Sequence, residues 1–439
     1  MRIAWFSPLP PSRSGIAAYS AELLPLLTAR GHLIEKFTES HARDFVWKQR
    51  RDPYDLTVFH LGNAACHDYM WAYLFRYPGL VVLHDAQLHQ ARALWLTRRW
   101  QPRRDDYLAE FRANHPEAPP EAGELVAAGL GGSLYHHWPL IRLVVERSRL
   151  TIVHNRCLME ELGTRYPAAN FAHIEMGVGD WAADGGGTRV KARSIRPGRD
   201  SAIVLAAFGG LTPEKRIPQV IRALAAIADR HPSLQLMLVG DTVEHYDARA
   251  EADRWGVGDR VHITGYVPDS DLASYIAAAD ICACLRWPTN RETSASWLRC
   301  LAAGRATIIT DLAHQGDLPT VDPRGWTKRD TRSGDNRAAI AVSIELVDED
   351  HSLQLALDRL ATDAALRSSL GQAGRAWWQA HHQLDAMADG YQRALHRAVQ
   401  APIPDPTLPR HLLAEGGERG HAIAASLGMT ERLAGILSR

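Results

Sequence analysis

The chain has 439 residues, of which 46% are hydrophobic and 23% charged, and its 50 Lys and Arg residues balance 50 Asp and Glu residues. This is the composition of an ordinary globular protein that is too long for one core, so we expect two domains with additions. The balanced charge excludes a global attraction to nucleic acid. The five cysteines show no CxxC pair and no Cys/His ligand spacing, which predicts free thiols and no zinc site.

The N-terminus, MRIAWFSPLPP, predicts a strand and a turn without the apolar core of a secretory signal. A helix pattern follows Gly15 and runs to Gly31, which completes a strand, loop and helix unit. Further strands are expected at 56–61, 80–83 and 150–153. Each ends in polar residues at the edge where ligands gather in open α/β sheets: His60, His84 with Asp85, and His154 with Asn155.

Glycines and Pro197 predict a linker over 179–200, and the strand, loop and helix pattern then begins again. We expect a helix over 217–229 and helices throughout 351–400, followed by a proline-led extension over 401–439 to which we assign no function. The expected strands of this half lie at 202–208, 234–239, 261–264, 281–285 and 306–309. The two halves predict two Rossmann-like, doubly wound α/β domains that face each other.

One stretch, 286–311, carries the strongest chemical signal. Thr293 or Ser294 can act as the N-cap of a helix over 295–303, and Gly304 stands where a left-handed residue ends a helix. A helix start presents free N–H groups and a positive dipole end, which favour a phosphate. The adjacent carboxylate of Glu292 can accept hydrogen bonds from hydroxyl groups. A phosphate next to hydroxyl groups suggests a sugar nucleotide.

Several motifs, taken in order, resemble those of the family 4 retaining glycosyltransferases of the GT-B fold. The resemblance covers roughly residues 1–400. It rests on five segments: SPLPPSRSGIAAYS, VVLHDAQLHQ, FGGLTPEKRIPQVIRAL, RVHITGYVPDSDLASYIAAADICACL and RETSASWLRCLAAGRATIITD. It implies transfer of a sugar from a nucleotide-diphosphate sugar to an acceptor hydroxyl, with retention at the anomeric carbon and with no metal or other cofactor.

The resemblance also implies a division of labour between domains. Residues 1–178 form the acceptor domain, to which a helix at about 383–400 returns, and residues 201–382 form the donor domain. The implied catalytic residues are His84, Lys215 and Glu292. The implied donor-binding residues are Gly15, Arg216, Val267, Thr293 and Ser294, and Asp85 is the implied acceptor-binding residue.

Two positions depart from the family pattern. Cys300, with Arg299 beside it, stands where a second glutamate contacts the ribose, and Gly210 stands where an arginine follows the phosphate-loop glycine. Arg216 or Arg13 are the candidates to replace that arginine.

Each of these residues also has a purely structural interpretation. Gly15 and Val267 suit turns, His84 suits a core histidine, Lys215 suits a solvated helix start, and Glu292 suits the first turn of a helix. In 91–104, ARALWLTRRWQPRR, arginines and tryptophans suit either an anionic membrane surface or a solvated helix that packs its tryptophans inward.

The resulting hypothesis is a cytoplasmic glycosyltransferase of polysaccharide or glycolipid synthesis, with peripheral contact at the inner face of the membrane through 91–104. Its partners are a sugar-nucleotide donor and a hydroxyl acceptor: a glycan, a lipid or a small molecule. A GT-B sugar-nucleotide epimerase and an inactive glycosyltransferase-like partner protein remain as alternatives. The epimerase requires acid/base carboxylates on the N-terminal side of the cleft, and the partner protein is suggested by the missing second glutamate.

Overall fold

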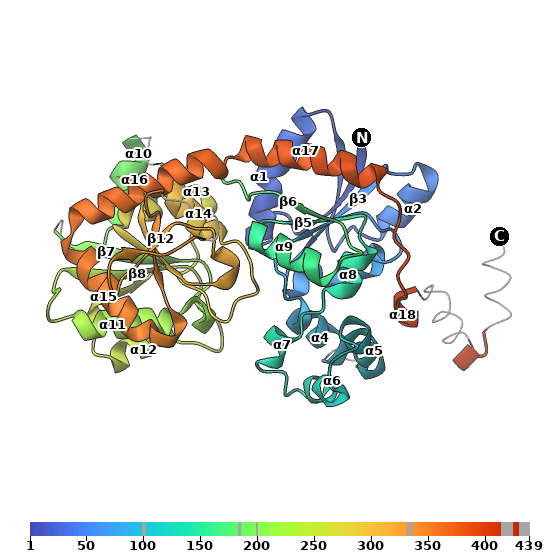
Figure 1. Cartoon of the computed structure of the whole chain (residues 1–439), viewed down its shortest axis with the longest axis horizontal. Helices are drawn as coiled ribbons and strands as arrows, with labels where there is room; N and C mark the ends of the chain where they lie inside the picture. The colour runs from blue at the N-terminus through green and yellow to red at the C-terminus, as the bar shows by residue number, and fades with distance from the viewer. Residues whose placement is uncertain are drawn as a thin grey trace.

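The computed structural model describes most of the chain: residues 1–98, 102–182, 186–198, 201–331, 334, 337–413 and 425–429. Two lobes lie side by side, and each is a largely parallel sheet between layers of helices (Figure 1). The predicted pair of doubly wound α/β domains is therefore confirmed. Among the described residues, no helix combines the length and the apolar character needed to cross a membrane.

The N-terminal sheet has six parallel strands in the order β2-β1-β3-β4-β5-β6. Its central strands are fully buried and mainly apolar, as expected for a sheet covered on both faces. The bounds are β1 (Arg2–Phe6), β2 (Leu33–Phe37), β3 (Leu56–Leu61), β4 (Leu80–Leu83), β5 (Leu150–Val153) and β6 (Phe171–His173).

Helices flank this sheet, and a group of short helices projects from it (Figure 1). The flanking helices are α1 (Gly15–Ala29), α2 (Asp44–Arg51), α3 (Trp71–Leu74), α8 (Arg142–Arg147) and α9 (Arg156–Arg165). The projecting group has its own apolar core and consists of α4 (His89–Thr97), α5 (Arg104–Asn114), α6 (Pro120–Ala127) and α7 (Leu134–His137).

The C-terminal sheet has eight strands in the order β13-β12-β14-β11-β10-β7-β8-β9, and β13 alone is antiparallel to its neighbour. The strands are β7 (Ile203–Phe208), β8 (Leu234–Val239), β9 (Val261–Ile263), β10 (Ile281–Cys284), β11 (Ala306–Thr310), β12 (Thr320–Asp322), β13 (Thr327–Lys328) and β14 (Ala341–Ile344). The helices are α10 (Gly186–Ile195), α11 (Ile217–Ile227), α12 (Ala248–Arg254), α13 (Asp269–Ala278), α14 (Ala295–Ala302), α15 (Glu349–Thr362) and α16 (Ala364–His381).

The predicted linker over 179–200 contains a helix, which corrects that expectation. Helix α10 begins at the predicted linker glycines and packs against α13. Lys191 on α10 forms an ion pair with Asp271 at 2.5 Å, and Ala192 is buried. Tertiary packing thus overrides the local preference of the glycines for an irregular chain. Residues 183–185 and 199–200 of this segment lie outside the described residues.

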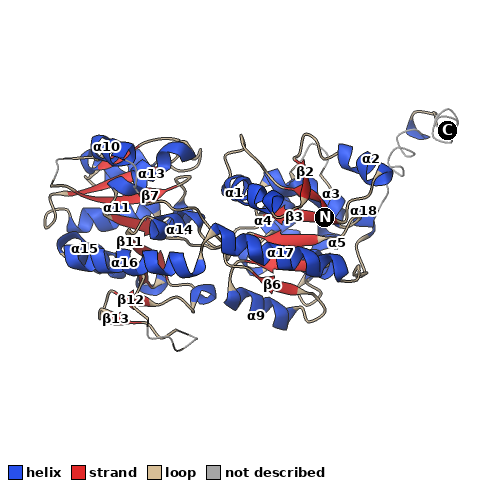
Figure 2. Cartoon of the chain, turned by 90° about the horizontal axis from the view of Figure 1, so that it is seen from above, coloured by secondary structure: helices blue, strands red, loops and turns tan. Residues whose placement is uncertain are grey.

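The chain crosses between the domains at two segments, 175–182 and 382–384, which we call the hinge. The Val178 N–H donates to the carbonyl oxygen of His382 at 3.0 Å, and His382 Nδ1 donates to the carbonyl oxygen of Met176 at 3.0 Å. Beyond the second segment, α17 (Leu384–Gln400) packs against α1 and closes the buried Tyr19–Tyr391 contact of the N-terminal domain. The two crossing segments are therefore tied together, and α16 and α17 span the two lobes along one side (Figure 2).

The tail continues past α17 along the N-terminal domain. Arg149 donates to the carbonyl oxygen of Ala401 at 3.0 Å, and α18 (Arg410–Leu413) buries Leu412 against the core of that domain. Residues 414–424 and 430–439 of the predicted extension lie outside the described residues.

Candidate active site

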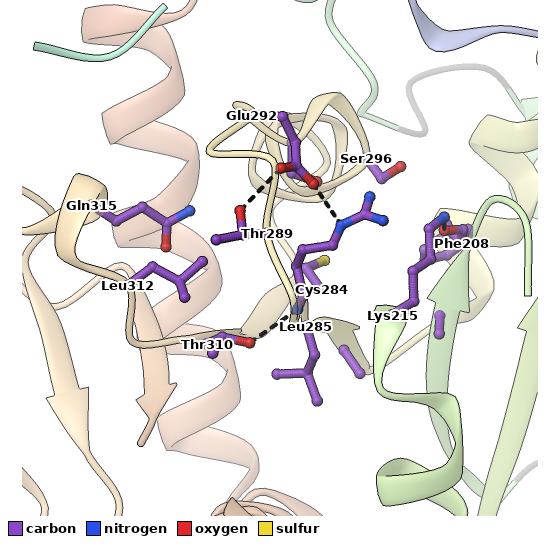
Figure 3. A pocket seen from close by; sticks show the side chains of 14 residues that line it. Phe208, Lys215, Cys284, Leu285, Thr289, Glu292, Ser296, Thr310, Leu312 and Gln315 are labelled. Carbon is purple, nitrogen blue, oxygen red and sulfur yellow. Dashed lines mark hydrogen bonds and ion pairs between the residues drawn. The ribbon is translucent and has the colours of Figure 1, made fainter. Parts of the chain in front are cut away.

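Glu292 lies in the loop between β10 and α14, and it lines two cavities. The first, which we call the strand-end pocket, is formed by C-terminal domain residues at the ends of β7, β10 and β11, and Lys215 and Arg286 line it (Figure 3). The second, which we call the hinge pocket, is lined from both domains and has a volume of about 220 Å³. Glu292, Ser294 and Gln315 line both, so the two pockets adjoin.

Lys215 reaches the strand-end pocket from the loop after β7. Its Nζ donates to the carbonyl oxygen of Phe208 at 2.5 Å. Gly209 has a φ of +88°, and a Cβ there would stand 2.2 Å from Lys215 Nζ, so only glycine allows this placement. Burial, reinforced by the nearby Arg286 charge, lowers the pKa of Lys215 to about 7.

Lys215 does not open the helix, which corrects the expectation. It ends a short 3₁₀ turn, and Arg216 in left-handed conformation separates this turn from α11. The turn directs the ammonium group back toward β7, so its positive charge does not oppose the dipole of α11.

Arg286 is a site residue that sequence reasoning missed. Its Nε donates to Glu292 Oε1 at 2.7 Å. Thr289 Oγ1 donates to the other oxygen, Glu292 Oε2, at 3.0 Å (Figure 3). The Arg286 N–H is held by Thr310 Oγ1 at the end of β11. The sequence could have indicated Arg286, because it directly follows a predicted strand and the carboxyl ends of the strands meet at the ligand-binding edge of the sheet.

The helix start predicted after Glu292 is present. Ser294 is the N-cap of α14, and its Oγ accepts from the Trp297 N–H at 3.3 Å. Thr293 instead donates through Oγ1 to the carbonyl oxygen of His154 in the other domain, at 3.2 Å. Gly304 follows the helix with a φ of +66°, as predicted for a left-handed stop.

Three predicted donor residues lie away from both pockets. Arg216 forms a two-pronged ion pair with Glu349 at the start of α15, with Nε at 2.7 Å from Oε1. Val267 packs against the apolar core beneath α13. Gly15 begins α1 next to the N-cap residue, Ser14. A Cβ at position 15 would meet no atom within 4 Å, so the surrounding chain leaves room for a larger residue there.

His84 belongs to a buried cluster of histidines at the carboxyl ends of the N-terminal strands. Its Nε2 lies 2.9 Å from His60 Nδ1, and its ring meets Tyr19 edge-on at 4.8 Å between centroids. His154 joins the cluster at 5.3 Å from His84. Burial, together with the neighbouring imidazoles, lowers the pKa values of His60 and His84, so these rings are neutral at pH 7. His84 lines neither pocket.

Asp85, the next residue, faces the C-terminal domain. Its Oδ2 accepts from the Asn63 N–H at 2.6 Å, and the following residue, Ala86, donates its N–H to the carbonyl oxygen of Asn290 at 2.8 Å. Burial, together with the Glu292 charge across the cleft, raises the pKa of Asp85 to about 7. The structure thus brings Asp85 and Glu292 together from opposite domains.

Cys300 is fully buried between Cys282 and Cys284. Hydrogen bonds with the two neighbouring thiols and burial raise the pKa of the Cys300 thiol. Its neighbour Arg299 stacks over Trp181 at 4.6 Å and lies 3.9 Å from Glu22 of α1. The thiol is therefore part of the core, and Arg299 contributes to the contact between domains.

The basic segment 91–104 is partly folded into the protein. Arg92 is buried, forms an ion pair with Glu110 and stacks over Trp71 at 4.4 Å, and Arg104 pairs with Glu124. Residues 99–101 lie outside the described residues. These two ion pairs reduce the basic surface that the sequence suggested, and membrane contact stays a prediction. Among the described residues, no group of three or more His, Cys, Asp or Glu side chains is arranged to hold a metal ion.

Comparison with known proteins gives a family match in the C-terminal domain. Residues 202–341, which contain the strand-end pocket, match the family model of the glycosyl transferases group 1. The D-inositol 3-phosphate glycosyltransferase of Kribbella flavida is 36% identical over 104 residues, which are 22% of this chain and 24% of that protein. The match thus spans about a quarter of the length of this curated relative.

Solved structures resemble almost the whole chain. Sucrose-phosphate synthase from Thermosynechococcus elongatus has a TM-score of 0.61 at 16% identity, over 90% of this chain and 98% of that one. Anabaena HepE, in complex with UDP and glucose, has a TM-score of 0.57 at 14% identity, over 90% and 99%. WaaG, a glycosyltransferase involved in lipopolysaccharide biosynthesis, has a TM-score of 0.57 at 15% identity, over 90% and 99%. The chain therefore has the GT-B fold, and its C-terminal domain carries the sequence pattern of the group 1 glycosyl transferases.

Proposed function

We propose that this protein is a glycosyltransferase that moves a sugar from a nucleotide-diphosphate sugar to an acceptor hydroxyl. One observation carries the proposal: Lys215, Arg286 and Glu292 line a single pocket at the start of α14, within the segment that matches the group 1 model. Two cations and a helix start suit a diphosphate, and a carboxylate suits sugar hydroxyls.

Lys215 and Arg286 are the residues that would stabilise the diphosphate leaving group. We propose Arg286 for the role expected of Arg216, because Arg286 lines the strand-end pocket and Arg216 does not. The negative charge of a diphosphate favours the ammonium form of Lys215, so donor binding is expected to raise its pKa from about 7. Backbone N–H groups at Thr293 and Ser294 and the dipole of α14 add to this stabilisation.

We further propose that transfer proceeds with retention and without a metal. The two cations supply the charge that a divalent ion supplies in metal-dependent transferases. Transfer on the same face as the departing diphosphate needs no carboxylate nucleophile. Closure of the domains, which the Asn290 and Thr293 contacts with the N-terminal domain support, would position acceptor and donor.

The experiment that tests the function is incubation of the purified chain with UDP-, GDP-, ADP- and dTDP-sugars. Slow hydrolysis with release of the nucleoside diphosphate is the expected result, and NMR of the first-formed anomer reports retention or inversion. UDP-glucose is the first donor to test, because HepE has been solved with it. The absence of binding to any of these nucleotides, measured by calorimetry, would leave only the inactive-partner alternative.

One observation favours the epimerase alternative. Asp85 and Glu292 approach each other from opposite domains, and a carboxyl with a pKa of about 7 can exchange protons at neutral pH. Inversion at C2 of the sugar, seen by NMR before any hydrolysis, would identify an epimerase. Retention of the C2 configuration together with sugar release supports the transferase.

The acceptor and the location are proposals of the same kind. The Kribbella relative is named for an inositol phosphate acceptor and WaaG for lipopolysaccharide synthesis, so small polyols and glycolipids are the first acceptors to test. We propose a cytoplasmic enzyme with peripheral membrane contact through 91–104. Flotation with anionic liposomes at low and high salt tests this contact, and absence from the lipid fraction at both would end it.

A further inference from the structure

Three of the five cysteines meet beside the strand-end pocket. Cys282 and Cys284 lie two residues apart on β10, so both side chains leave the same face of the strand. Cys300 lies on α14, which packs against β10, and its thiol hydrogen-bonds with the thiols of both other cysteines. The donor chemistry proposed above uses none of the three, so this cluster of nucleophilic side chains has no assigned role.

The three thiols differ in their access to solvent. Cys282 and Cys300 are both 0% exposed. Cys284 is partly exposed, and Figure 3 shows it among the side chains that line the strand-end pocket. A small oxidant that enters this pocket therefore meets the Cys284 thiol first, and the Cys300 thiol contacts Cys284 from the core side.

Two cations border the Cys284 thiol. Arg286 follows it by two residues, and Lys215 lines the same pocket. Burial lowers the pKa of Lys215 to about 7, while a charge on the Cys284 sulfur acts to raise it, so the two groups interact. A neighbouring cation favours the thiolate, which is the form of cysteine that attacks a peroxide.

Cys300 has the surroundings of the second thiol of a pair. Hydrogen bonds with Cys282 and Cys284, together with burial, raise the pKa of Cys300, so its thiol stays protonated. Thiols that are already in hydrogen-bond contact need only small movements to reach the geometry of a disulfide. Disulfides that form in a reducing compartment are usually transient and serve catalysis or redox sensing.

We propose that Cys284 is an oxidation site, which hydrogen peroxide converts into a reversible disulfide with Cys300. The Cys284 thiolate attacks the peroxide: an S–O bond forms, the O–O bond breaks, and hydroxide leaves as the sulfur becomes a sulfenic acid. The Cys300 sulfur then attacks the oxidised sulfur: the S–S bond forms, the S–O bond breaks, and water leaves with the thiol proton. Two thiols and one hydrogen peroxide thus give one disulfide and two water molecules.

The disulfide couples oxidation to the strand-end pocket. It ties the end of β10 to α14 and draws the Cys284 sulfur toward the core. Arg286 lies two residues farther along the chain, where Thr310 holds its N–H and Glu292 pairs with its Nε. A shift of the strand end therefore moves a pocket cation, and we expect weaker nucleotide binding. This consequence rests on the proposed function, whereas the formation of the disulfide does not.

The test treats the fully reduced, unaltered protein with hydrogen peroxide and maps its cysteines by mass spectrometry. We expect a pair of peptides joined through Cys284 and Cys300, which dithiothreitol separates again. Calorimetry then compares the reduced and the oxidised protein with the nucleotide that binds in the donor experiment. We expect its Kd to rise at least tenfold on oxidation and to recover on reduction.

Three variants assign the roles of the thiols. In Cys300→Ala the sulfenic acid at Cys284 has lost its partner, so we expect it to accumulate and to be trapped by dimedone. In Cys284→Ala we expect oxidation of Cys300 to slow at least tenfold. The matched control is Cys66→Ala: Cys66 is also partly exposed, but burial and the carboxylates of Asp68 and Glu39 raise its pKa. The disulfide should form in this control within twofold of the parent rate, and thermal melts confirm that each variant is folded.

Three results on the unaltered protein would overturn the inference. The first is that Cys284 does not react at a peroxide concentration that oxidises free cysteine. The second is that Cys66 is oxidised before Cys284. The third is a disulfide that joins Cys282, rather than Cys284, to Cys300. Because all three are read from the unaltered protein, they hold even where a variant fails to fold.

Failure of the two proposals is distinguishable. If a nucleotide binds and the disulfide does not form, the redox inference fails alone. If the disulfide forms and no nucleotide binds, the proposed function fails, and the oxidation site stands without its effect on the donor. A disulfide that leaves the nucleotide Kd unchanged would contradict the coupling to the pocket.

Discussion

The strand ends of the two domains share one topology and differ in chemistry. In the C-terminal domain, the residues after β7 and β10 are charged: Lys215 and Arg286 line a pocket together with Glu292. In the N-terminal domain, the residues at the ends of β3, β4 and β5 are His60, His84 and His154, which are buried against Tyr19. One edge offers cations for an anion, and the other offers neutral rings.

This difference shows that the carboxyl ends of the parallel strands determine where a ligand site lies. The side chains at those ends determine which kind of ligand suits the site. The C-terminal edge suits a diphosphate, whereas the N-terminal edge packs its neutral histidine rings into the core. Four tests can break or sharpen this contrast.

The largest expected effect is that of Lys215→Ala. Removing the ammonium leaves the leaving group without its main cation, so we expect kcat/KM for donor hydrolysis to fall at least 100-fold, about 2.7 kcal/mol of transition-state stabilisation. The measurement is release of the nucleoside diphosphate, with Lys36→Ala at an exposed position as the control. Activity that survives within tenfold would remove Lys215 from the phosphate site.

Next comes the pair Gly209→Ala and Gly210→Ala. At Gly209 the new methyl group would stand 2.2 Å from Lys215 Nζ at a φ of +88°, whereas at Gly210 it meets nothing within 4 Å. We expect Gly209→Ala to displace the lysine, to weaken nucleotide binding at least tenfold and to destabilise the fold by about 1 kcal/mol. Calorimetry and urea unfolding measure both effects, and equal behaviour of the two variants would contradict this account of Gly209.

The buried, neutral histidines of the N-terminal domain lead us to expect a pH dependence of stability. Burial lowers the pKa values of His67 and His154 to about 4, so between about pH 6.5 and pH 4 the unfolded chain binds protons that the folded chain does not. These histidines therefore lower the free energy of unfolding as the pH falls through this window. Asp85, whose pKa is raised to about 7, acts in the opposite direction.

His67→Asn isolates the histidine contribution to this slope. Between pH 7 and pH 4.5, we expect the free energy of unfolding of His67→Asn to fall by roughly 1–3 kcal/mol less than that of the parent protein. Urea unfolding at the two pH values measures this difference. His396→Asn on α17 changes an exposed histidine and serves as the control. A parent-like slope in His67→Asn would show that His67 is protonated in the folded state.

The smallest expected effect is that of Arg13→Ala. Arg13 stacks on Tyr266 at 4.0 Å and pairs with Asp241 at 3.4 Å across the cleft, but both ion-pair side chains are more than half exposed to solvent. We expect a loss of less than about 1 kcal/mol in the free energy of unfolding and a change within threefold in nucleotide affinity. A tenfold loss of nucleotide binding would instead assign Arg13 to the diphosphate.

Much of the fold followed from local patterns. The predicted bounds of β3, β4, β5 and β8 match the structure, and these are buried, nearly continuous apolar runs. The missed strands lie mainly at sheet edges. β2, with the sequence LIEKF, is largely accessible, and β13 has only two residues. Such strands form because the adjacent strand offers free backbone N–H and C=O groups for pairing. The residues of the edge strand alone do not indicate this pairing.

The sequence alone determined the two α/β halves and a helix start at Thr293 or Ser294, of which the structure selects Ser294. Only the tertiary structure decided that Glu349 holds Arg216, that Arg286 pairs with Glu292 and that Asp85 faces Glu292 from the other domain. It also decided that His154 and His314 line one cavity. The physical reason is that strand, turn and cap signals act over a few residues. The partners of charged groups depend on how loops and domains pack. This packing joins Arg216 to Glu349, which lies 133 positions away, and it folds one loop so that Arg286 meets Glu292.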